Sequence, residues 1–281
     1  MQGFDAAHCI ALTGVPRSGT TLACTLLNAG ADVVALAEPL NPHTWPLPRA
    51  DRLAWVLSEF ARMRMHCLEQ GSAPTRQRQG RRVDNFFRDE QGRRIWDAEV
   101  AELPLGKPLS TDFVLAIKHN AAFLALLPEL TRWLPVVAVV RNPLRVLASW
   151  NSIDLPVSQG YLPAAEQTDD ALRTALAART DVHDRQLVAM DWCFAAIARA
   201  RDTCAVVRYE TMVTDGGRDL SIRCGVPASG AQVATPLQSH DPLQRHAASS
   251  IRVLARKLLD APGAWRVFYS EADVLALLPE A

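Results

Sequence analysis

The chain has 281 residues, 49% of them hydrophobic, and its 30 acidic and 30 basic side chains leave no net charge at neutral pH. A neutral chain has no long-range field that would attract nucleic acid or an anionic membrane, so any anion site must be local. No apolar run approaches the roughly 18 residues of a membrane span, and the first residues lack a basic leader. Six cysteines without paired short spacing indicate buried thiols in a reducing compartment. We therefore expect a cytoplasmic protein with no nucleic-acid partner and no membrane span.

Short apolar runs alternate with longer helical patterns, which is typical of a parallel sheet covered by helices on both faces. The expected strands are Cys9–Thr13, Val33–Leu36, Phe113–Lys118, Val136–Val140 and Ala205–Tyr209. The main expected helices are Thr20–Gly30, Arg52–Gln70 and Val182–Arg201. The predicted fold class is therefore α/β, with three layers and ligands bound at the carboxyl ends of the strands.

Two long stretches, about residues 49–110 and 152–203, interrupt this alternation. The first contains an arginine-rich segment, GSAPTRQRQGRRVDNFFRDEQGRR, in which acidic residues are interleaved. Charge runs of this kind are usually solvated, so we expect a solvated or mobile loop, with a lid or substrate-binding loop as the alternative. One domain over residues 1–281, carrying two insertions that shape the substrate site, accounts for this organisation.

The segment TGVPRSGTTL, residues 13–22, joins the first expected strand to the first expected helix. The unpaired N–H groups and the positive end of a helix form an anion cradle at such a junction. The spacing of Gly14 and Gly19 matches an ATP-binding P-loop, but Thr20 stands where that loop has its lysine. The cation is instead Arg17, whose guanidinium suits a group that bears several oxygens.

A second candidate phosphate site lies in VVAVVRNPLRVLASW, residues 136–150. Arg141 is expected at the carboxyl end of a buried strand, and Pro143 favours the first turn of the helix that follows. Ser149 lies about two turns into that helix, so an arginine and a hydroxyl converge from two elements. The alternative is that Arg141 pairs with a nearby acid and Ser149 packs within its helix.

The segments GVPRSGTTL and RNPLRVLAS resemble the 5′-phosphosulfate loop and the 3′-phosphate site of sulfotransferases that use 3′-phosphoadenosine 5′-phosphosulfate. The segment VVRYETMV, residues 206–213, resembles the family's strand that ends in Tyr-Glu beside the nucleotide. The resemblance implies a P-loop-like fold, this donor without a metal, and donor contacts from Arg17, Ser18, Gly19, Thr20, Thr21, Arg141, Ser149 and Tyr209. For Tyr209 a buried core position is the alternative. The Arg-Lys-Gly loop of cytosolic members is absent, and SHDPLQRHAASS, residues 239–250, is the candidate replacement.

Sulfuryl transfer to a hydroxyl needs a base for the acceptor proton and a cation for the bridging oxygen. Glu38 follows a strand in EPLNPHTW, which is similar to the Glu-Pro element of carbohydrate sulfotransferases, and we expect burial to raise its pKa. The alternative is a structural carboxylate that pairs with Arg17 or another cation. Lys118, one of only three lysines, is assigned to the bridging oxygen. His119 is the alternative base, because cytosolic members end a comparable strand with Lys-Thr-His. Adjacent strand residues point to opposite faces, so Lys118 and His119 are expected not to reach one site together without a local bend.

These observations predict a metal-independent sulfotransferase that acts on a small-molecule hydroxyl acceptor, whether sugar, lipid or natural product. No His, Cys and carboxylate cluster has the spacing of a metal site. Two alternatives remain, a P-loop small-molecule kinase or phosphotransferase and a non-catalytic nucleotide-binding module. The aromatic residues Trp45, Trp150 and Tyr161 are candidates either for the acceptor pocket or for core packing.

Overall fold

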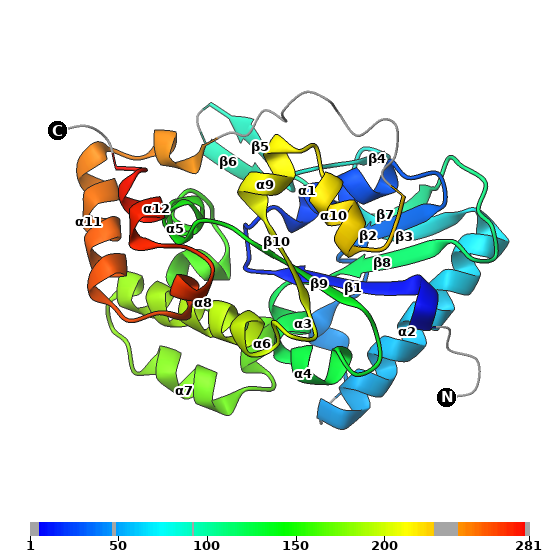
Figure 1. Cartoon of the computed structure of the whole chain (residues 1–281), viewed down its shortest axis with the longest axis horizontal. Coiled ribbons are helices and arrows are strands. Elements are labelled where there is room, and N and C mark those ends of the chain that lie inside the picture. The colour runs from blue at the N-terminus through cyan, green and yellow to red at the C-terminus, as the bar shows by residue number, and fades with distance from the viewer. Residues whose placement is uncertain (1–5, 47–48, 92, 228–240, 279–281) are drawn as a thin grey trace.

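A five-stranded parallel sheet forms the centre of the computed structural model, which describes residues 6–46, 49–91, 93–227 and 241–278 (Figure 1). The strand order is β10-β9-β1-β8-β2. The strands are β1 Cys9–Gly14, β2 Val33–Ala37, β8 Val114–Lys118, β9 Val136–Val140 and β10 Ala205–Arg208. The α/β class and the five predicted strands are therefore confirmed, each strand end to within one residue.

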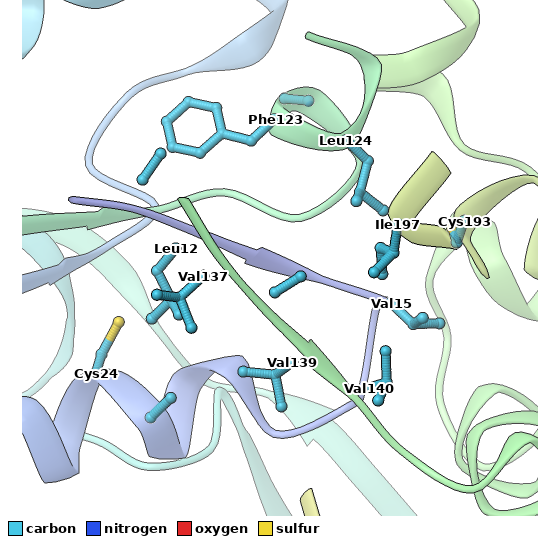
Figure 2. Packing of buried hydrophobic residues seen from close by; sticks show 14 of the residues in the cluster. Leu12, Val15, Cys24, Phe123, Leu124, Val137, Val139, Val140, Cys193 and Ile197 are labelled. Atoms are coloured by element: carbon cyan, nitrogen blue, oxygen red, sulfur yellow. The ribbon is translucent and has the colours of Figure 1, made fainter. Parts of the chain in front are cut away.

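Helices cover both faces of this sheet (Figure 1). On one face lie α1 Thr20–Asn28 and α10 Arg218–Arg223, and on the other lie α3 Ala121–Ala125, α4 Leu127–Leu130 and α8 Val182–Arg199. Figure 2 shows the buried core between the layers, with Cys24 of α1 on one side of the strands and Phe123 and Ile197 on the other. Burial of apolar side chains on both faces of the strands is the main stabilising contribution to this arrangement.

The remaining helices surround these layers. The α-helices are α2 Arg49–Gln70, α5 Pro143–Trp150, α6 Pro163–Glu166, α7 Asp170–Ala177, α9 Tyr209–Thr214, α11 Ala248–Asp260 and α12 Glu271–Leu275. The 3-10 helices are η1 Ala6–His8, η2 Pro42–Thr44, η3 Pro156–Gln159, η4 Pro242–Arg245 and η5 Ala264–Val267. Among the described residues, none of the helices combines the length and the apolar character that crossing a bilayer requires. All six cysteines are buried and free, as predicted.

The arginine-rich stretch of the first insertion forms antiparallel strands, so the prediction of a solvated loop is wrong. The strands are β3 Ser72–Arg78, β4 Arg81–Arg82, β5 Phe87–Glu90, β6 Arg93–Trp96 and β7 Glu99–Pro104. Alternate residues of β3 are buried and half-buried, which is the period of a strand with one covered face. Gln79 and Gly80 both have positive φ and form a two-residue connection between paired Arg78 and Arg81, the geometry of a tight hairpin. The charged side chains do not prevent pairing, because they are exposed or find partners, as Arg76 does with Glu38 and Arg82 with the Ala35 carbonyl.

Candidate active site

A cavity of about 790 Å³ opens at the carboxyl ends of the parallel strands. At or just beyond its carboxyl end, each strand contributes one residue to the cavity wall. In the order β1, β2, β8, β9 and β10, these residues are Arg17, Glu38, Lys118, Arg141 and Tyr209. The sheet register explains their proximity, because Ala37 pairs with Lys118 and the Glu38 N–H donates to the Lys118 carbonyl at 3.0 Å. The parallel topology therefore gathers residues that are far apart in sequence at one edge, where α/β proteins bind ligands.

The loop between β1 and α1 requires its glycines. Gly19 has φ 95°, and a Cβ there would lie 2.3 Å from the ring of Tyr209. A Cβ on Gly14 would lie 2.2 Å from the carbonyl oxygen of Val139. Gly19 is also the N-cap of α1, whose first N–H groups have no partner within the helix. The loop is thus packed closely against β9 and Tyr209, with the positive end of α1 at the cavity.

Ser18 differs from the other predicted donor-binding residues because it faces the protein. Its hydroxyl donates to the Val139 carbonyl at 2.8 Å, and its N–H donates to the Val15 carbonyl at 3.0 Å. The side chain is fully buried and does not line the cavity, whereas Gly19, Thr20 and Thr21 do. Ser18 therefore anchors the loop to β9.

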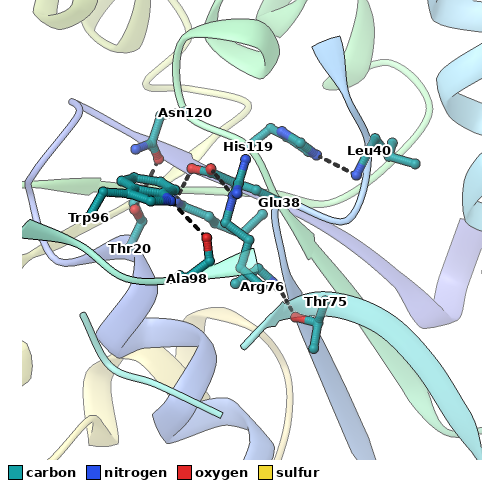
Figure 3. A network of polar contacts seen from close by, with 11 residues as sticks. Thr20, Glu38, Leu40, Thr75, Arg76, Trp96, Ala98, His119 and Asn120 are labelled. Carbon is teal, nitrogen blue, oxygen red and sulfur yellow. Dashed lines mark hydrogen bonds and ion pairs between the residues drawn. The ribbon is translucent and has the colours of Figure 1, made fainter. Parts of the chain in front are cut away.

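Asn120, which the sequence interpretation missed, connects two of the strand ends. Its side-chain oxygen accepts a hydrogen bond from the Thr20 hydroxyl at 2.9 Å, and its carbonyl accepts one from Thr13 at 3.0 Å. Figure 3 shows Asn120 and Thr20 on one side of the polar network. The available signal was the run of three polar residues, Lys118 to Asn120, directly after an apolar strand.

Arg17 lies in the left-handed region, with φ 73°, and its guanidinium reaches across the loop. Its Nε donates to the Ser149 hydroxyl at 3.3 Å and its Nη2 to the Asn85 side-chain oxygen at 3.2 Å. The guanidinium also lies 4.9 Å from the centre of the Phe87 ring. The structure thus brings together the two predicted phosphate sites, since Arg17 comes from the first and Ser149 from the second.

Arg141 is 7% exposed and lies 4.2 Å above the ring of Tyr209. Its Nε is buried and has no hydrogen-bond partner among the residues that the structure describes. An unpaired buried guanidinium nitrogen is costly, so a ligand is the expected partner. Glu210 fixes the adjacent turn by accepting from the Asn142 N–H at 3.0 Å and from the Tyr269 hydroxyl at 2.7 Å. Both residues of the Tyr209-Glu210 motif therefore contact the segment that follows β9: Tyr209 stacks on Arg141, and Glu210 binds the Asn142 N–H.

The arginines that line the cavity differ in whether a carboxylate neutralises them. Arg76 pairs with Glu38 at 3.0 Å, whereas no carboxylate in the described part of the chain lies within ion-pair distance of three others, Arg17, Arg94 and Arg141. Burial lowers the pKa of all three, and repulsion by Arg94 and Arg141 helps to lower that of Arg17 to about 9. This surplus of positive charge favours a ligand with more than one anionic group.

Arg94 belongs to β6 in the first insertion and was not predicted as a site residue. Its Nη1 donates to the Ser152 hydroxyl at 3.3 Å, and Ser152 in turn donates to the Ser149 carbonyl at 2.9 Å. Its guanidinium lies 5.5 Å from the centre of the Phe87 ring, which Arg17 also contacts. The only sequence signal was an arginine-rich segment, and pairing of β5 with β6 was needed to place this member at the cavity.

Glu38 lies between two cations at the end of β2 (Figure 3). Its carboxylate contacts the Lys118 Nζ at 2.5 Å and the Arg76 Nε at 3.0 Å. Burial alone would raise its pKa, but Lys118, His119 and Arg76 together lower the pKa of Glu38 to about 2. The expectation of a raised pKa is therefore wrong, because the sequence did not show that two cations converge on this carboxylate.

His119 is 2% exposed, and its Nε2 accepts a hydrogen bond from the Leu40 N–H at 3.3 Å. The ring packs edge-on against Trp45 and Phe123. Burial lowers the pKa of His119 to about 3, so the imidazole is neutral at physiological pH. Both Lys118 and His119 line the cavity although they are adjacent, because the pairing of β8 ends at Lys118.

The other predicted residues divide between the core and the cavity. Trp45 and Trp150 are buried away from the cavity wall, whereas Tyr161 lines it. Arg145 pairs with Asp241 at 2.9 Å, which places part of the segment 239–250 beside α5, although residues 239 and 240 lie outside the described residues. Within the described chain, no three His, Cys, Asp or Glu side chains are placed so that they could hold a metal ion.

Fold and cavity together define an α/β protein in which a glycine-bearing loop at a helix start and two buried arginines, Arg17 and Arg141, meet at one cavity. A model described as the sulfotransferase family matches residues 10–220 of the 281. The chain therefore belongs to the sulfotransferase family and is a transferase. The solved sulfotransferase STF9 from Mycobacterium avium aligns with a TM-score of 0.41 at 14% identity, covering 91% of this chain and 77% of that one. No curated protein matches the sequence.

Proposed function

We propose that the protein transfers a sulfuryl group from 3′-phosphoadenosine 5′-phosphosulfate to the hydroxyl of a small-molecule acceptor. The observation that carries this proposal is a set of three arginines in one cavity that have no carboxylate partner among the described residues, two of them in the predicted phosphate sites. A donor with separate 5′ and 3′ anionic groups matches two such sites better than a nucleotide with a single phosphate chain. The donor supplies the activated sulfuryl group when it is bound.

The residues proposed for the 5′ group are the Arg17 guanidinium, the N–H groups at the start of α1, including that of Thr20, and the hydroxyl of Thr21. The Thr20 hydroxyl itself donates to Asn120. The residues for the 3′-phosphate are Arg141, through its unpaired Nε, and Ser149. Tyr209 stacks on Arg141 and packs against Gly19. It therefore fixes the position of the proposed 3′-phosphate site relative to the proposed 5′ site.

Glu38 is the proposed base, and Lys118 is the proposed cation for the bridging oxygen. Glu38 is ionised at neutral pH and is ready to accept the acceptor proton as the new oxygen–sulfur bond forms. The bond from sulfur to the bridging oxygen breaks, and Lys118 compensates the charge on that oxygen. When Lys118 turns toward the bridging oxygen, Glu38 loses its closest cation, so its affinity for a proton rises during the reaction.

Calorimetric titration tests the donor assignment directly. The protein is titrated with adenosine 3′,5′-bisphosphate and, separately, with Mg-ATP, and we expect the bisphosphate to bind more tightly. Tighter binding of Mg-ATP would favour a kinase and overturn the proposal. Transfer of labelled sulfate to acceptors in a library of hydroxyl compounds then separates an enzyme from a non-catalytic binding module.

A further inference from the structure

We propose that the acceptor carries its hydroxyl on an apolar skeleton, such as an aryl or long-chain alcohol, and is not a sugar. This inference rests on the proposed sulfuryl transfer and concerns the part of the cavity beyond Glu38. The relevant wall, called here the acceptor wall, comprises Leu155, Pro156, Val157, Tyr161, Leu162, Pro163 and Ala164. Six of its seven side chains are hydrocarbon.

The acceptor wall shares the cavity with the proposed base and lies beside the helix that follows β8. It includes the start of α6, which packs against α3, the helix that begins directly after His119 and Asn120. Ala121 and Ala122 of α3 and Leu40 also line the cavity, and the Leu40 N–H is bound to His119. An acceptor hydroxyl near Glu38 would therefore have its carbon skeleton among these apolar side chains.

The backbone of the acceptor wall has few polar groups left for a ligand. The Leu162 N–H donates to the side chain of Glu166 at 2.6 Å, and the Tyr161 N–H donates within the wall at 2.9 Å. Carbonyl oxygens that already accept hydrogen bonds from backbone N–H groups are those of Leu155, Pro156, Val157, Leu162 and Pro163. Sugar hydroxyls turned toward this wall would find only the Tyr161 hydroxyl among its side chains, and each hydroxyl buried there without a partner would cost about 1–3 kcal/mol.

Contacts with α8 hold this wall in place. Gln186 is fully buried and donates to the Ser158 carbonyl at 2.8 Å, while Arg185 donates to the Gln159 carbonyl at 2.6 Å. Gly160 has φ 77°, and a Cβ there would lie 2.7 Å from the backbone nitrogen of Gln186. The wall is therefore preformed, so apolar ligands can bind without first ordering a loop.

Aromatic rings from the first insertion extend the apolar character of the cavity. Phe86 and Trp96 both line it, and their ring centres are 5.3 Å apart. The indole N–H of Trp96 donates to the Ala98 carbonyl at 2.7 Å, so only the ring surface remains for contact with a ligand (Figure 3). Lys118 lies 5.0 Å from the centre of the Phe86 ring. The proposed cation thus has one ring of this aromatic pair close to its ammonium group.

A binding experiment tests this inference independently of turnover. With adenosine 3′,5′-bisphosphate bound, the protein is titrated with 2-naphthol, 1-decanol, methyl β-glucoside and N-acetylglucosamine. We expect saturable binding of at least one of the two apolar alcohols, about tenfold or more tighter than either sugar. Equal or tighter binding of a sugar, or no saturable binding of either alcohol, would overturn the inference. Failure of the bisphosphate itself to bind would instead count against the proposed donor.

The variant Leu155→Asp places a charge on a half-buried position of the acceptor wall. We expect it to weaken 2-naphthol about tenfold while bisphosphate affinity is retained, since burying an alcohol skeleton beside a charge is unfavourable. Leu187→Asp is the control, because Leu187 is also half-buried but lies outside the cavity wall. Equal losses of 2-naphthol affinity in the two variants would contradict the inference. Labelled-sulfate transfer to the same four compounds should follow the order of binding.

Discussion

At the scale of single residues, the carboxylate of Glu38 is ionised throughout the neutral range, because the charges of Lys118 and Arg76 outweigh its burial. His119 is also unprotonated there, but its Nε2 already accepts the Leu40 N–H. Both groups are therefore in the protonation state of a base, and only Glu38 directly contacts the proposed cation.

Substitution of Glu38 by Gln should lower kcat by about 10² to 10⁴, because glutamine cannot accept the proton of the acceptor hydroxyl. Affinity for adenosine 3′,5′-bisphosphate should change little, since Glu38 does not belong to either proposed phosphate site. His119→Gln is the matched variant, because a glutamine oxygen can still accept the Leu40 N–H. If His119→Gln lost turnover to this extent and Glu38→Gln did not, His119 would be the base. Steady-state kinetics with titration calorimetry makes the comparison.

Arg141→Ala should weaken adenosine 3′,5′-bisphosphate by about tenfold to a hundredfold, the range for loss of a charge-assisted hydrogen bond. Adenosine 5′-monophosphate should lose much less affinity, because it lacks the group that Arg141 is proposed to hold. Calorimetry with the two nucleotides measures the difference. Equal losses for both would reject the 3′-phosphate assignment.

At the scale of elements, the hairpin of β5 and β6 brings a cation to a site that the family resemblance did not assign to it. The Arg94 guanidinium donates to Ser152, two residues beyond the end of α5. Its neighbour Arg245 is neutralised by Asp89 at 2.7 Å. The hairpin thus supplies one unneutralised cation beside Ser149 and Arg141. We propose that it serves the 3′-phosphate in place of the absent Arg-Lys-Gly loop.

Arg94→Ala should weaken adenosine 3′,5′-bisphosphate by about tenfold, with a smaller effect on adenosine 5′-monophosphate. Arg88→Ala is the matched control on the same hairpin, because Arg88 pairs with Glu90 at 2.9 Å and Asp97 at 3.1 Å, and its side chain is 46% exposed. Its removal should leave both affinities near those of the original protein. An Arg94→Ala variant with unchanged bisphosphate affinity would show that the hairpin does not contact the donor.

At the scale of the whole molecule, burial of neutral His119 makes stability depend on pH. Its pKa is lowered from 6.5 to about 3 on folding, so between these values the unfolded chain binds a proton that the folded chain does not. The stabilising contribution is complete above pH 6.5 and is lost as the pH falls toward 3. The paired carboxylate of Glu38 adds a second loss, which begins only as the pH falls below 4.5.

His119→Gln should therefore flatten the acid dependence of the free energy of unfolding between pH 6.5 and 4.5. The slope should fall by at most about 1.4 kcal/mol per pH unit, the value for one proton. Urea denaturation at a series of pH values measures this slope. Glu38→Gln, in contrast, should leave it unchanged in that range, and an unaltered slope in His119→Gln would contradict a buried neutral imidazole.

The local sequence pattern by itself determined the parallel strands and the loops at their carboxyl ends. Continuous apolar runs identified the parallel strands, because strands buried on both faces contain few polar residues. Glycine spacing and the placement of Arg17, Arg141 and Ser149 predicted the loops that line the cavity, since such loops follow strand ends directly. Antiparallel pairing in the arginine-rich stretch was missed because frequent charges obscured the period-two alternation of β3.

Only the tertiary structure decided the electrostatics of the site. The register of β2 against β8 places Lys118 beside Glu38 and lowers a pKa that burial alone would raise. The packing of Ser18 against β9 removes its hydroxyl from the cavity, and the β5–β6 hairpin brings Arg94 into it. Such contacts join residues distant in the chain, and Coulomb interactions depend on distance in space, whereas the sequence specifies only distance along the backbone.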